Sequence, residues 1–303
     1  MSEKFYQQQV ELLLDVLPVI QSFDCFALKG GTAINLFVQD MPRLSVDIDL
    51  TYLPIEPRDI FLRNLNTALE ALSNQLESLG FGVIKQYAKQ DKQLIKLLIS
   101  RFSTEIKIEP NIVLRGSVFG TELRALVQNA QERFLQSQQV RTLALPDLYA
   151  GKICAALDRQ HPRDLFDIKL LFESEGITDE MRQAFVIYLA SGPGPMNELL
   201  APDELDMRGV YNKEFVGMTN VGVSYDELHE VRSKLIKTLQ TQLTKNERQF
   251  LLSIKMGKPD WNLLTVPNIK NLPALQWKLL NIKKMNKTKH SKMSDQLKKV
   301  LGL

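Results

Sequence analysis

The stretch FALKGGTAINLFVQDMPRLSVDIDLTY, residues 26–52, decides the fold that this sequence predicts. It closes on residues 45–52, where polar and apolar side chains alternate as they do in a strand. Because successive side chains of a strand point to opposite faces, Asp47 and Asp49 share one face while the apolar residues between and after them face a core. Two carboxylates on one face repel each other unless a cation lies between them, and oxygen ligands favour a hard cation such as Mg²⁺, with Mn²⁺ as the alternative. The pair predicts a metal site for phosphoryl or nucleotidyl transfer.

The same stretch begins with a short apolar run, a predicted buried strand, that ends on Gly30-Gly31-Thr32 before a helical segment. Glycine has no Cβ, so the backbone can approach a phosphate closely there. The free N–H groups of the helix start favour an anion, and the hydroxyl of Thr32 would cap the helix or bind phosphate. Taken singly, a Gly-Gly-Thr turn can be an ordinary turn without a ligand, and an Asp-x-Asp strand can be a solvated edge of a sheet. Their order along the chain favours a site that binds a metal–nucleotide complex.

Three further strands are expected at residues 82–87, 94–101 and 104–113, after an amphipathic helix at residues 56–79. The last of them alternates strictly, so that its charged residues share one face. Glu109 on that face would supply a third metal-binding carboxylate or act as a general base toward an attacking hydroxyl. A solvated charged strand face explains the same pattern equally well.

A second group of charged residues lies further along the chain. Residues 146–157 predict a helix that contains Lys152, and Pro162 suits the start of the next helix. Asp164 and Asp167 are three residues apart and share a face of that helix. A lysine can hold phosphate oxygens, and the aspartates could pair with it. Charged residues at a helix start are usually surface groups, so this cluster predicts little by itself.

Composition describes a soluble globular protein of 303 residues, because 44% of them are hydrophobic and 24% are charged. The sequence shows no apolar region after a basic start and no apolar run near 18 residues, so neither secretion nor membrane insertion is expected. Cys25 and Cys154 both lie in apolar patterns and are expected to be buried reduced thiols. These features predict a cytoplasmic protein without a membrane partner.

The second half of the chain is mostly helical, and a turn-rich link at residues 191–195 indicates a boundary in this region. We expect a first domain at residues 1–175 and a helical second domain at residues 176–303. Residues 121–140 fit a helix and a strand equally well. The second domain ends in a basic tail that would either be a solvated face or meet RNA phosphates. Its lysines are Lys278, Lys283, Lys284, Lys287, Lys289, Lys292, Lys298 and Lys299.

Four segments together resemble the AbiEii/AbiGii-type nucleotidyltransferase toxins of type IV toxin–antitoxin systems, within the DNA polymerase β-like superfamily. They are LKGGTAINL (residues 28–36), RLSVDIDL (43–50), LYAGKICAALDRQHPRDLFDIKLL (148–171) and NLPALQWKLLNI (271–282). The resemblance covers most of the chain, and the third segment is its most specific part. It implies an α/β (α+β) nucleotidyltransferase fold, with a mixed β-sheet flanked by helices, followed by a mainly helical C-terminal domain.

The resemblance also implies roles for individual residues. The Gly-Thr turn and the Asp-x-Asp motif would hold nucleotide and Mg²⁺, through Gly31 and its neighbour Gly30, Thr32, Asp47 and Asp49. The family's essential lysine falls on Lys152, and its following acidic motif falls on Asp164 and Asp167. One departure is a longer segment between the turn and the first aspartate, which predicts a differently built loop at residues 39–43.

The function expected from these observations is transfer of a nucleoside monophosphate from an NTP to an acceptor hydroxyl. The resemblance implies RNA, particularly the tRNA 3′ end, as the acceptor and a cognate antitoxin as partner, so the chain is expected to act as the toxin of a toxin–antitoxin or phage-defence system. Transfer to a small molecule such as an antibiotic is the first alternative. A non-catalytic nucleotide- or partner-binding protein of the same fold is the second, and the intact pair of aspartates argues against it.

Overall fold

The computed structural model describes residues 3–89, 93–219 and 221–303. Contacts between Cα atoms divide the chain into two compact units. The sheet unit comprises Met1–Ala144 together with Gly217–Val221, and the helical unit comprises Leu145–Val216 together with Gly222–Leu303. One short segment from the second half of the sequence, Gly217–Val221, therefore belongs to the sheet unit.

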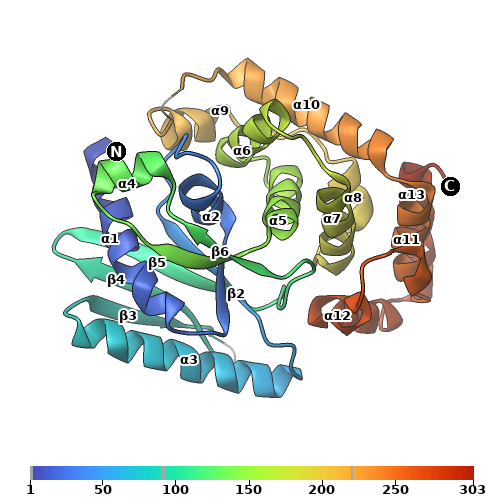
Figure 1. Ribbon diagram of the computed structural model, residues 1–303. Helices are drawn as coiled ribbons and strands as arrows, with labels where there is room; N and C mark the ends of the chain where they lie inside the picture. The colour runs from blue at the N-terminus through green and yellow to red at the C-terminus, as the bar shows by residue number, and fades with distance from the viewer. Residues whose placement is uncertain (1–2, 90–92, 220) are drawn as a thin grey trace. The chain divides into compact units, whose positions relative to one another are not determined.

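The sheet unit is built on one mixed sheet of seven strands in the order β3-β4-β5-β2-β1-β7-β6 (Figure 1). The pairs β2–β5 and β1–β7 are parallel, and the other neighbours are antiparallel. This sheet with its flanking helices confirms the predicted fold class. The strands are β1 (Phe26–Lys29), β2 (Asp47–Tyr52), β3 (Gly82–Tyr87), β4 (Leu94–Arg101), β5 (Thr104–Asn111), β6 (Thr121–Ala125) and β7 (Gln139–Leu143).

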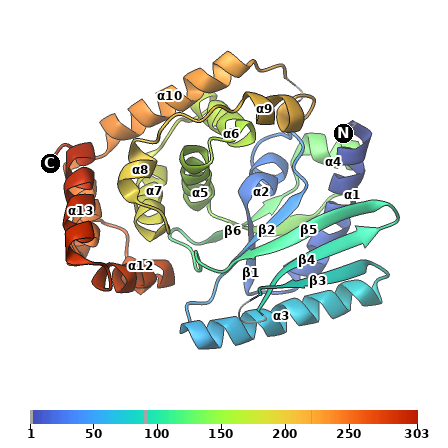
Figure 2. The same cartoon turned by 180° about the vertical axis from the view of Figure 1, so that it is seen from behind.

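Helices cover both faces of this sheet. Helices α1 (Glu3–Gln21) and α3 (Arg58–Ser78) pack on one face, and α2 (Gly30–Phe37) lies over the other beside β1 and β2 (Figures 1 and 2). Ile48 and Leu50 of β2 are fully buried, as their alternation with the aspartates predicts. The aspartates consequently face away from this core.

The structure settles the secondary structure of one segment that the sequence left open and moves the start of one predicted helix. Residues 121–140, which fit helix and strand equally, form β6, the short helix α4 (Gln128–Phe134) and the beginning of β7. Helix α2 starts at Gly30 rather than near Thr32, and its N-cap is Lys29. Both glycines therefore belong to the first turn of the helix.

The helical unit consists of short and medium helices. Helix α5 packs against α6 and α7, α10 against α6, and α11 against α7 and α13. Serine or threonine capping boxes start α10 and α11. The elements are α5 (Leu145–Asp158), α6 (Pro162–Glu173), α7 (Asp179–Ser191), α8 (Met196–Leu200), α9 (Arg208–Val210), a π-helical turn η1 (Tyr211–Phe215), α10 (Tyr225–Gln242), α11 (Lys245–Lys255), the 3₁₀ turns η2 (Trp261–Leu263) and η3 (Ile269–Asn271), α12 (Pro273–Lys283) and α13 (Lys287–Leu301).

These units do not coincide with the expected ranges 1–175 and 176–303. Helices α5 and α6 group with the C-terminal helices because α5 packs along α7, and the link at residues 191–195 lies inside the helical unit. The domain ranges 1–175 and 176–303 stay a prediction. No helix in the described ranges is long and apolar enough to cross a membrane.

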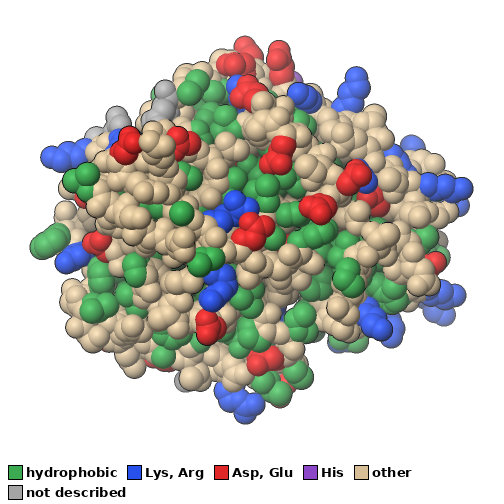
Figure 3. Space-filling view, viewed as in Figure 1, with side chains coloured by type: hydrophobic (Ala, Val, Ile, Leu, Met, Phe, Trp, Pro, Cys, Tyr) green, Lys and Arg blue, Asp and Glu red, His purple; other side chains and the backbone are tan. Residues whose placement is uncertain are grey.

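The basic C-terminal segment is folded. Lys278 is partly buried, and its Nζ donates hydrogen bonds to the carbonyl oxygens of Gly192 (2.8 Å) and Gly194 (2.7 Å). Burial, and more weakly the nearby Lys255, lower the pKa of Lys278 to about 8. The other seven lysines of the segment are exposed, and Lys and Arg side chains stand out where α13 is drawn (Figure 3).

Candidate functional site

Four charged side chains form one cluster on one face of the sheet, and we call them the sheet cluster: Asp47 and Asp49 of β2 with Lys107 and Glu109 of β5. The two strands are parallel neighbours, and their register pairs Asp47 with Lys107 and Asp49 with Glu109. All four side chains are partly exposed, whereas the residues that alternate with them are buried. The alternation that the sequence shows in both strands therefore brings the three predicted carboxylates together on one face.

Lysines neutralise part of this cluster. Nζ of Lys107 lies 3.5 Å from Oδ1 of Asp47 and 3.3 Å from Oε2 of Glu109, and Nζ of Lys96 lies 2.7 Å from Oε1 of Glu109. Burial would raise the pKa of Glu109, but the two lysines lower it below its ordinary value. Burial would likewise lower the pKa of Lys107, and the two carboxylates raise it instead. The alternation of β5 predicted that Lys107 shares a face with Glu109, but the sequence reasoning gave Lys107 no role and did not single out Lys96 of β4.

The glycine turn touches the strand of aspartates. The antiparallel register of β1 and β2 sets Lys29 opposite Asp49, so the chain enters α2 directly beside that carboxylate. Gly30 has a φ of +74°, and a Cβ added to it would lie only 2.4 Å from Oδ2 of Asp49. Only glycine combines this backbone conformation with so close an approach. The helix start and the carboxylate are therefore immediate neighbours.

Thr32 is buried, and its hydroxyl is already bonded within the protein. Its Oγ1 donates a hydrogen bond to the carbonyl oxygen of Asp47 at 2.5 Å and lies 3.1 Å from Oγ of Ser45. It does not cap α2, whose N-cap is Lys29. In this structure the hydroxyl fixes the start of β2 to the first turn of α2. The binding of phosphate by Gly30, Gly31 and Thr32 stays a prediction.

Arg43 and Ser45 complete the surroundings of the glycine turn, and the sequence reasoning missed them as site residues. A Cβ on Gly31 would lie 2.7 Å from Nη2 of Arg43 and 2.9 Å from Oγ of Ser45. Arg43 is buried, and its backbone forms a β-bridge with Thr219 of the returning segment. The available signal was the spacing Arg-x-Ser-x-Asp-x-Asp, although β2 begins only at Asp47 and the first two of these residues precede the strand.

The donor set of the sheet cluster suits a Mg²⁺ ion that is shared with a substrate. Among the residues that the structure describes, no three His, Cys, Asp or Glu side chains gather closely enough to hold a metal by themselves. Mg²⁺, however, is usually bound by one or two carboxylates together with substrate phosphates and waters. Asp47 and Asp49 provide those carboxylates beside a helix start that favours phosphate. Glu109 is held by two lysines, and its place as a third ligand stays a prediction.

A second cluster, which we call the helix cluster, lies in the helical unit. Lys152 of α5 places Nζ 2.7 Å from Oδ1 of Asp164 and 2.8 Å from Oδ2 of Asp167. Both aspartates lie on one face of α6, and all three side chains are at least 95% buried. The structure therefore joins the three residues that the sequence placed in one group, and it surrounds the ammonium of Lys152 with carboxylates.

Arg159 is the outer member of the helix cluster. Its Nε and Nη2 bind the two oxygens of Asp164 at 2.5 and 3.0 Å, while most of its side chain is exposed. Burial would raise the pKa of Asp164, but Lys152 and Arg159 hold it well below its usual range. His161 caps the start of α6 by accepting a hydrogen bond from the backbone N–H of Arg163. The cluster thus contains two cations and two anions, the balance that buried charges require.

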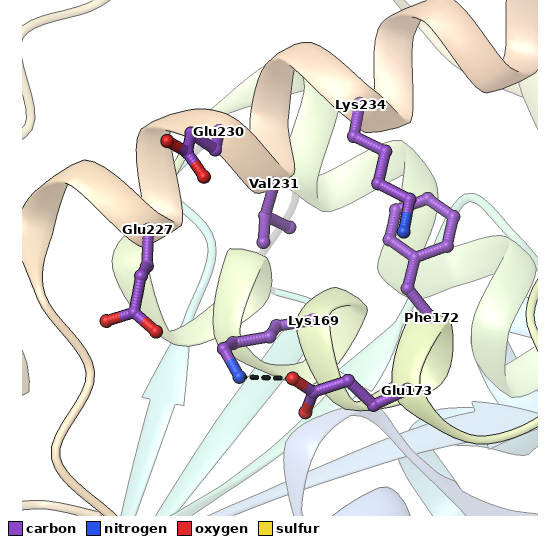
Figure 4. Close-up of a pocket in the computed structure, with 7 residues that line it drawn as sticks. All are labelled: Lys169, Phe172, Glu173, Glu227, Glu230, Val231 and Lys234. Atoms are coloured by element: carbon purple, nitrogen blue, oxygen red, sulfur yellow. Dashed lines mark hydrogen bonds and ion pairs between the residues drawn. The ribbon is translucent and has the colours of Figure 1, made fainter.

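The helical unit also has a surface pocket between α6 and α10, and none of the predicted site residues lines it (Figure 4). Lys169 pairs with Glu173 along α6, and the ammonium of Lys234 lies 4.5 Å from the centre of the Phe172 ring. Glu227 and Glu230 project from α10. Each lysine of the pocket has a partner of its own, so this arrangement is typical of a solvated helix–helix groove.

Two comparisons with known proteins, one with family models and one with solved structures, found a match. The model of the family described as nucleotidyl transferase AbiEii toxin, type IV TA system, matches residues 11–280. Among solved structures, the chain is similar to the nucleotidyltransferase toxin MenT4 from Mycobacterium tuberculosis H37Rv. The TM-score is 0.61 at 16% sequence identity, over 88% of this chain and 93% of that one. At this identity the likeness shows a shared fold. A comparison with curated proteins found no match.

Proposed function

The chain belongs to the AbiEii family of nucleotidyltransferase toxins of type IV toxin–antitoxin systems, and from this we propose that it transfers a nucleoside monophosphate from an NTP to RNA in a Mg²⁺-dependent reaction. The acceptor that we propose is a hydroxyl at the 3′ end of tRNA. The hydroxyl oxygen forms a bond to the α-phosphorus. The bond between the α-phosphorus and the oxygen that bridges to the β-phosphate breaks, and pyrophosphate leaves. We further propose a cytoplasmic toxin that is restrained by a cognate antitoxin and serves in phage defence.

The observation that supports this proposal best is the contact between the glycine turn and Asp49. A Cβ on Gly30 would lie 2.4 Å from Oδ2 of Asp49, so a phosphate bound at the start of α2 would be next to a metal-binding carboxylate. Phosphate and metal need to be neighbours in a metal–nucleotide complex. A non-catalytic protein of the same fold would not need the backbone of Gly30 to lie so close to the carboxylate of Asp49.

Individual residues then take the following roles. The backbone N–H groups at Gly30 and Gly31, with Thr32, cradle the phosphates. A Mg²⁺ ion held by Asp47 and Asp49 would neutralise charge on the phosphates and orient the in-line attack. Glu109 is either a third ligand or the base that accepts the proton of the attacking hydroxyl.

In the helical unit, Lys152 is proposed to bind the triphosphate, and Asp164 and Asp167 to position it. Its place between two buried carboxylates supports a positioned ammonium, since the two ion pairs restrict its otherwise flexible side chain. The exposed lysines of α12 and α13 support a polynucleotide acceptor over a small molecule, because clustered lysines neutralise phosphates.

The decisive experiment supplies the full chain with each radiolabelled NTP, Mg²⁺ and total RNA. We expect label in tRNA with one or a few of the NTPs, and none with Asp49→Asn. The matched control is Asp59→Asn, which makes the same substitution at an aspartate in the first turn of α3 and should leave labelling unchanged. Label in no macromolecule at all would contradict the proposal.

Growth of a host cell tests the toxin role separately. Expression of the wild-type chain should slow growth, and expression of Asp49→Asn should not. Equal growth of both strains, with both proteins present at the same level, would overturn the toxin role and leave the labelling result standing.

A further inference from the structure

We propose that Lys107 is a positioning residue that tunes metal binding: its ammonium lies between Asp47 and Glu109 and leaves this place when a divalent cation binds to the aspartates. This inference rests on the proposed function, because it presumes a metal at Asp47 and Asp49. It adds a role for a lysine that the proposed reaction does not itself require.

The register of the two strands is the first observation. In the sheet cluster, Asp47 pairs with Lys107 and Asp49 pairs with Glu109, so the four side chains occupy the corners of a small rectangle on one face. Three corners carry carboxylates and the fourth carries an ammonium. Lys107 is therefore the one cation whose backbone position belongs to the rectangle itself.

The distances form the second observation. Nζ of Lys107 lies 3.5 Å from Asp47 and 3.3 Å from Glu109, and is thus shared between a proposed metal ligand and the carboxylate on the next corner. A divalent cation on Asp47 would lie within a few ångströms of this ammonium. Because like charges at such a separation repel strongly, the two cannot hold Asp47 at once without a cost to metal binding.

Exposure and flexibility show how Lys107 can move aside. Its side chain is 39% exposed, and lysine carries its charge on a flexible four-carbon stem. Glu109 keeps a partner when Lys107 leaves, because Lys96 contacts its other oxygen at 2.7 Å. Displacement therefore needs no rearrangement of the strands.

The test measures binding of Mn²⁺ to the full chain without nucleotide, by titration of the electron paramagnetic resonance signal of free Mn²⁺. Removing one positive charge next to the ion in Lys107→Met should tighten Mn²⁺ binding about tenfold. Lys107→Arg keeps the charge and should bind Mn²⁺ much as the wild type does. Lys85→Met is the matched control, since Lys85 pairs with Glu70 of α3 at 2.6 Å on the opposite face, and it should leave Mn²⁺ affinity unchanged.

A second measurement needs no variant and covers the case in which Lys107→Met fails to fold. Amine-reactive labelling followed by mass spectrometry should show that saturating Mn²⁺ increases modification of Lys107 in the wild type and leaves that of Lys85 constant.

The outcomes separate the two proposals. Mn²⁺ binding that Asp47→Asn abolishes, with unchanged affinity in Lys107→Met and unchanged labelling of Lys107, would overturn the role of Lys107 alone. Weaker Mn²⁺ binding in Lys107→Met would overturn it as well, because it would make the lysine a support of the ion. Absence of Mn²⁺ binding by the wild type at millimolar concentration would overturn the proposed metal site together with this inference.

Discussion

Oγ1 of Thr32 donates a hydrogen bond to the backbone carbonyl of Asp47 over 2.5 Å, and this bond joins the first turn of α2 to the first residue of β2. It connects the anion-favouring end of a helix to the strand that carries both aspartates. The position of Asp47 thus depends on a hydroxyl that lies on a different element.

Thr32→Val should test this connection. Valine keeps the shape but leaves the partly buried carbonyl of Asp47 without this donor, which should cost about 1 kcal/mol of the free energy of unfolding. Nucleotide transfer should fall further than stability alone explains, because the start of β2 is no longer fixed. Urea unfolding and tRNA labelling measure the two effects, and Thr32→Ser should preserve both. Full activity in a folded Thr32→Val would show that the bond does not position Asp47.

Gly30→Ala should abolish activity through a contact with Asp49. Alanine at a φ of +74° is strained by roughly 1–2 kcal/mol, and its Cβ would also force the carboxylate of Asp49 to move. Gly80→Ala is the control, since Gly80 has a φ of +85° but no atom near the added Cβ. We expect comparable strain in both variants and loss of tRNA labelling in Gly30→Ala alone. Equal activity of the two variants would contradict the proposed importance of this approach.

Lys152→Met should destabilise the helical unit severely. Removing the cation from a buried ion pair leaves its carboxylates less compensated and costs about 3–5 kcal/mol. Lys169→Met removes the partly exposed pair with Glu173 along α6 and should cost at most about 1 kcal/mol. Urea unfolding compares them. A similar small loss for both variants would show that the helix cluster adds little to stability.

Asp164 should make stability depend on pH under acidic conditions. Its pKa in the folded chain lies well below its ordinary value of 3.8, so its contribution is fully present above that value and is lost as the pH falls below it. Asp164→Asn should flatten the slope of the free energy of unfolding between about pH 2 and 4 by up to about 1.4 kcal/mol per pH unit. Leu165→Ala, at a fully buried position of the same helix, should lower stability at every pH without changing the slope. An unchanged slope in Asp164→Asn would be inconsistent with this linkage.

The exposed lysines of α13 should govern binding of RNA. Replacing Lys287, Lys289, Lys292, Lys298 and Lys299 with glutamine should weaken tRNA binding and reduce the slope of log Kd against log salt by roughly 0.7–0.9 for each phosphate that the variant no longer neutralises. Fluorescence anisotropy over a salt series measures this slope, and the corresponding arginine variant should keep it. An unchanged affinity and slope would assign these lysines to a solvated surface.

Patterns local to one strand or helix were readable from the sequence. The alternation around Asp47 and Asp49 predicted a strand with one buried face, and the same reasoning placed Glu109 on the matching face of β5. Pro162 predicted the start of α6, which the structure confirms. Periodicity carries such information because each residue faces the core or solvent regardless of what lies across from it.

Contacts between distant segments were not readable in this way. The hydroxyl of Thr32 was expected to meet phosphate or cap a helix, but it bonds to a carbonyl that only the pairing of β1 with β2 brings near. Lys96 and Lys107 became part of the site through the register of β4 and β5 with β2, which sequence periodicity does not specify. Arg43 forms a backbone bridge with Thr219, a partner that no local pattern indicates.

That bridge has a consequence for the order in which the protein is made. The backbone N–H of Leu44 donates to the carbonyl of Met218, and Arg43 pairs with Thr219, so the approach to Asp47 is completed by a segment that leaves the ribosome after α5 through η1. A nascent chain that has emerged only as far as Ala144 contains every strand of the sheet but lacks this last piece. These two contacts can therefore form only after residues 145–216 have been synthesised.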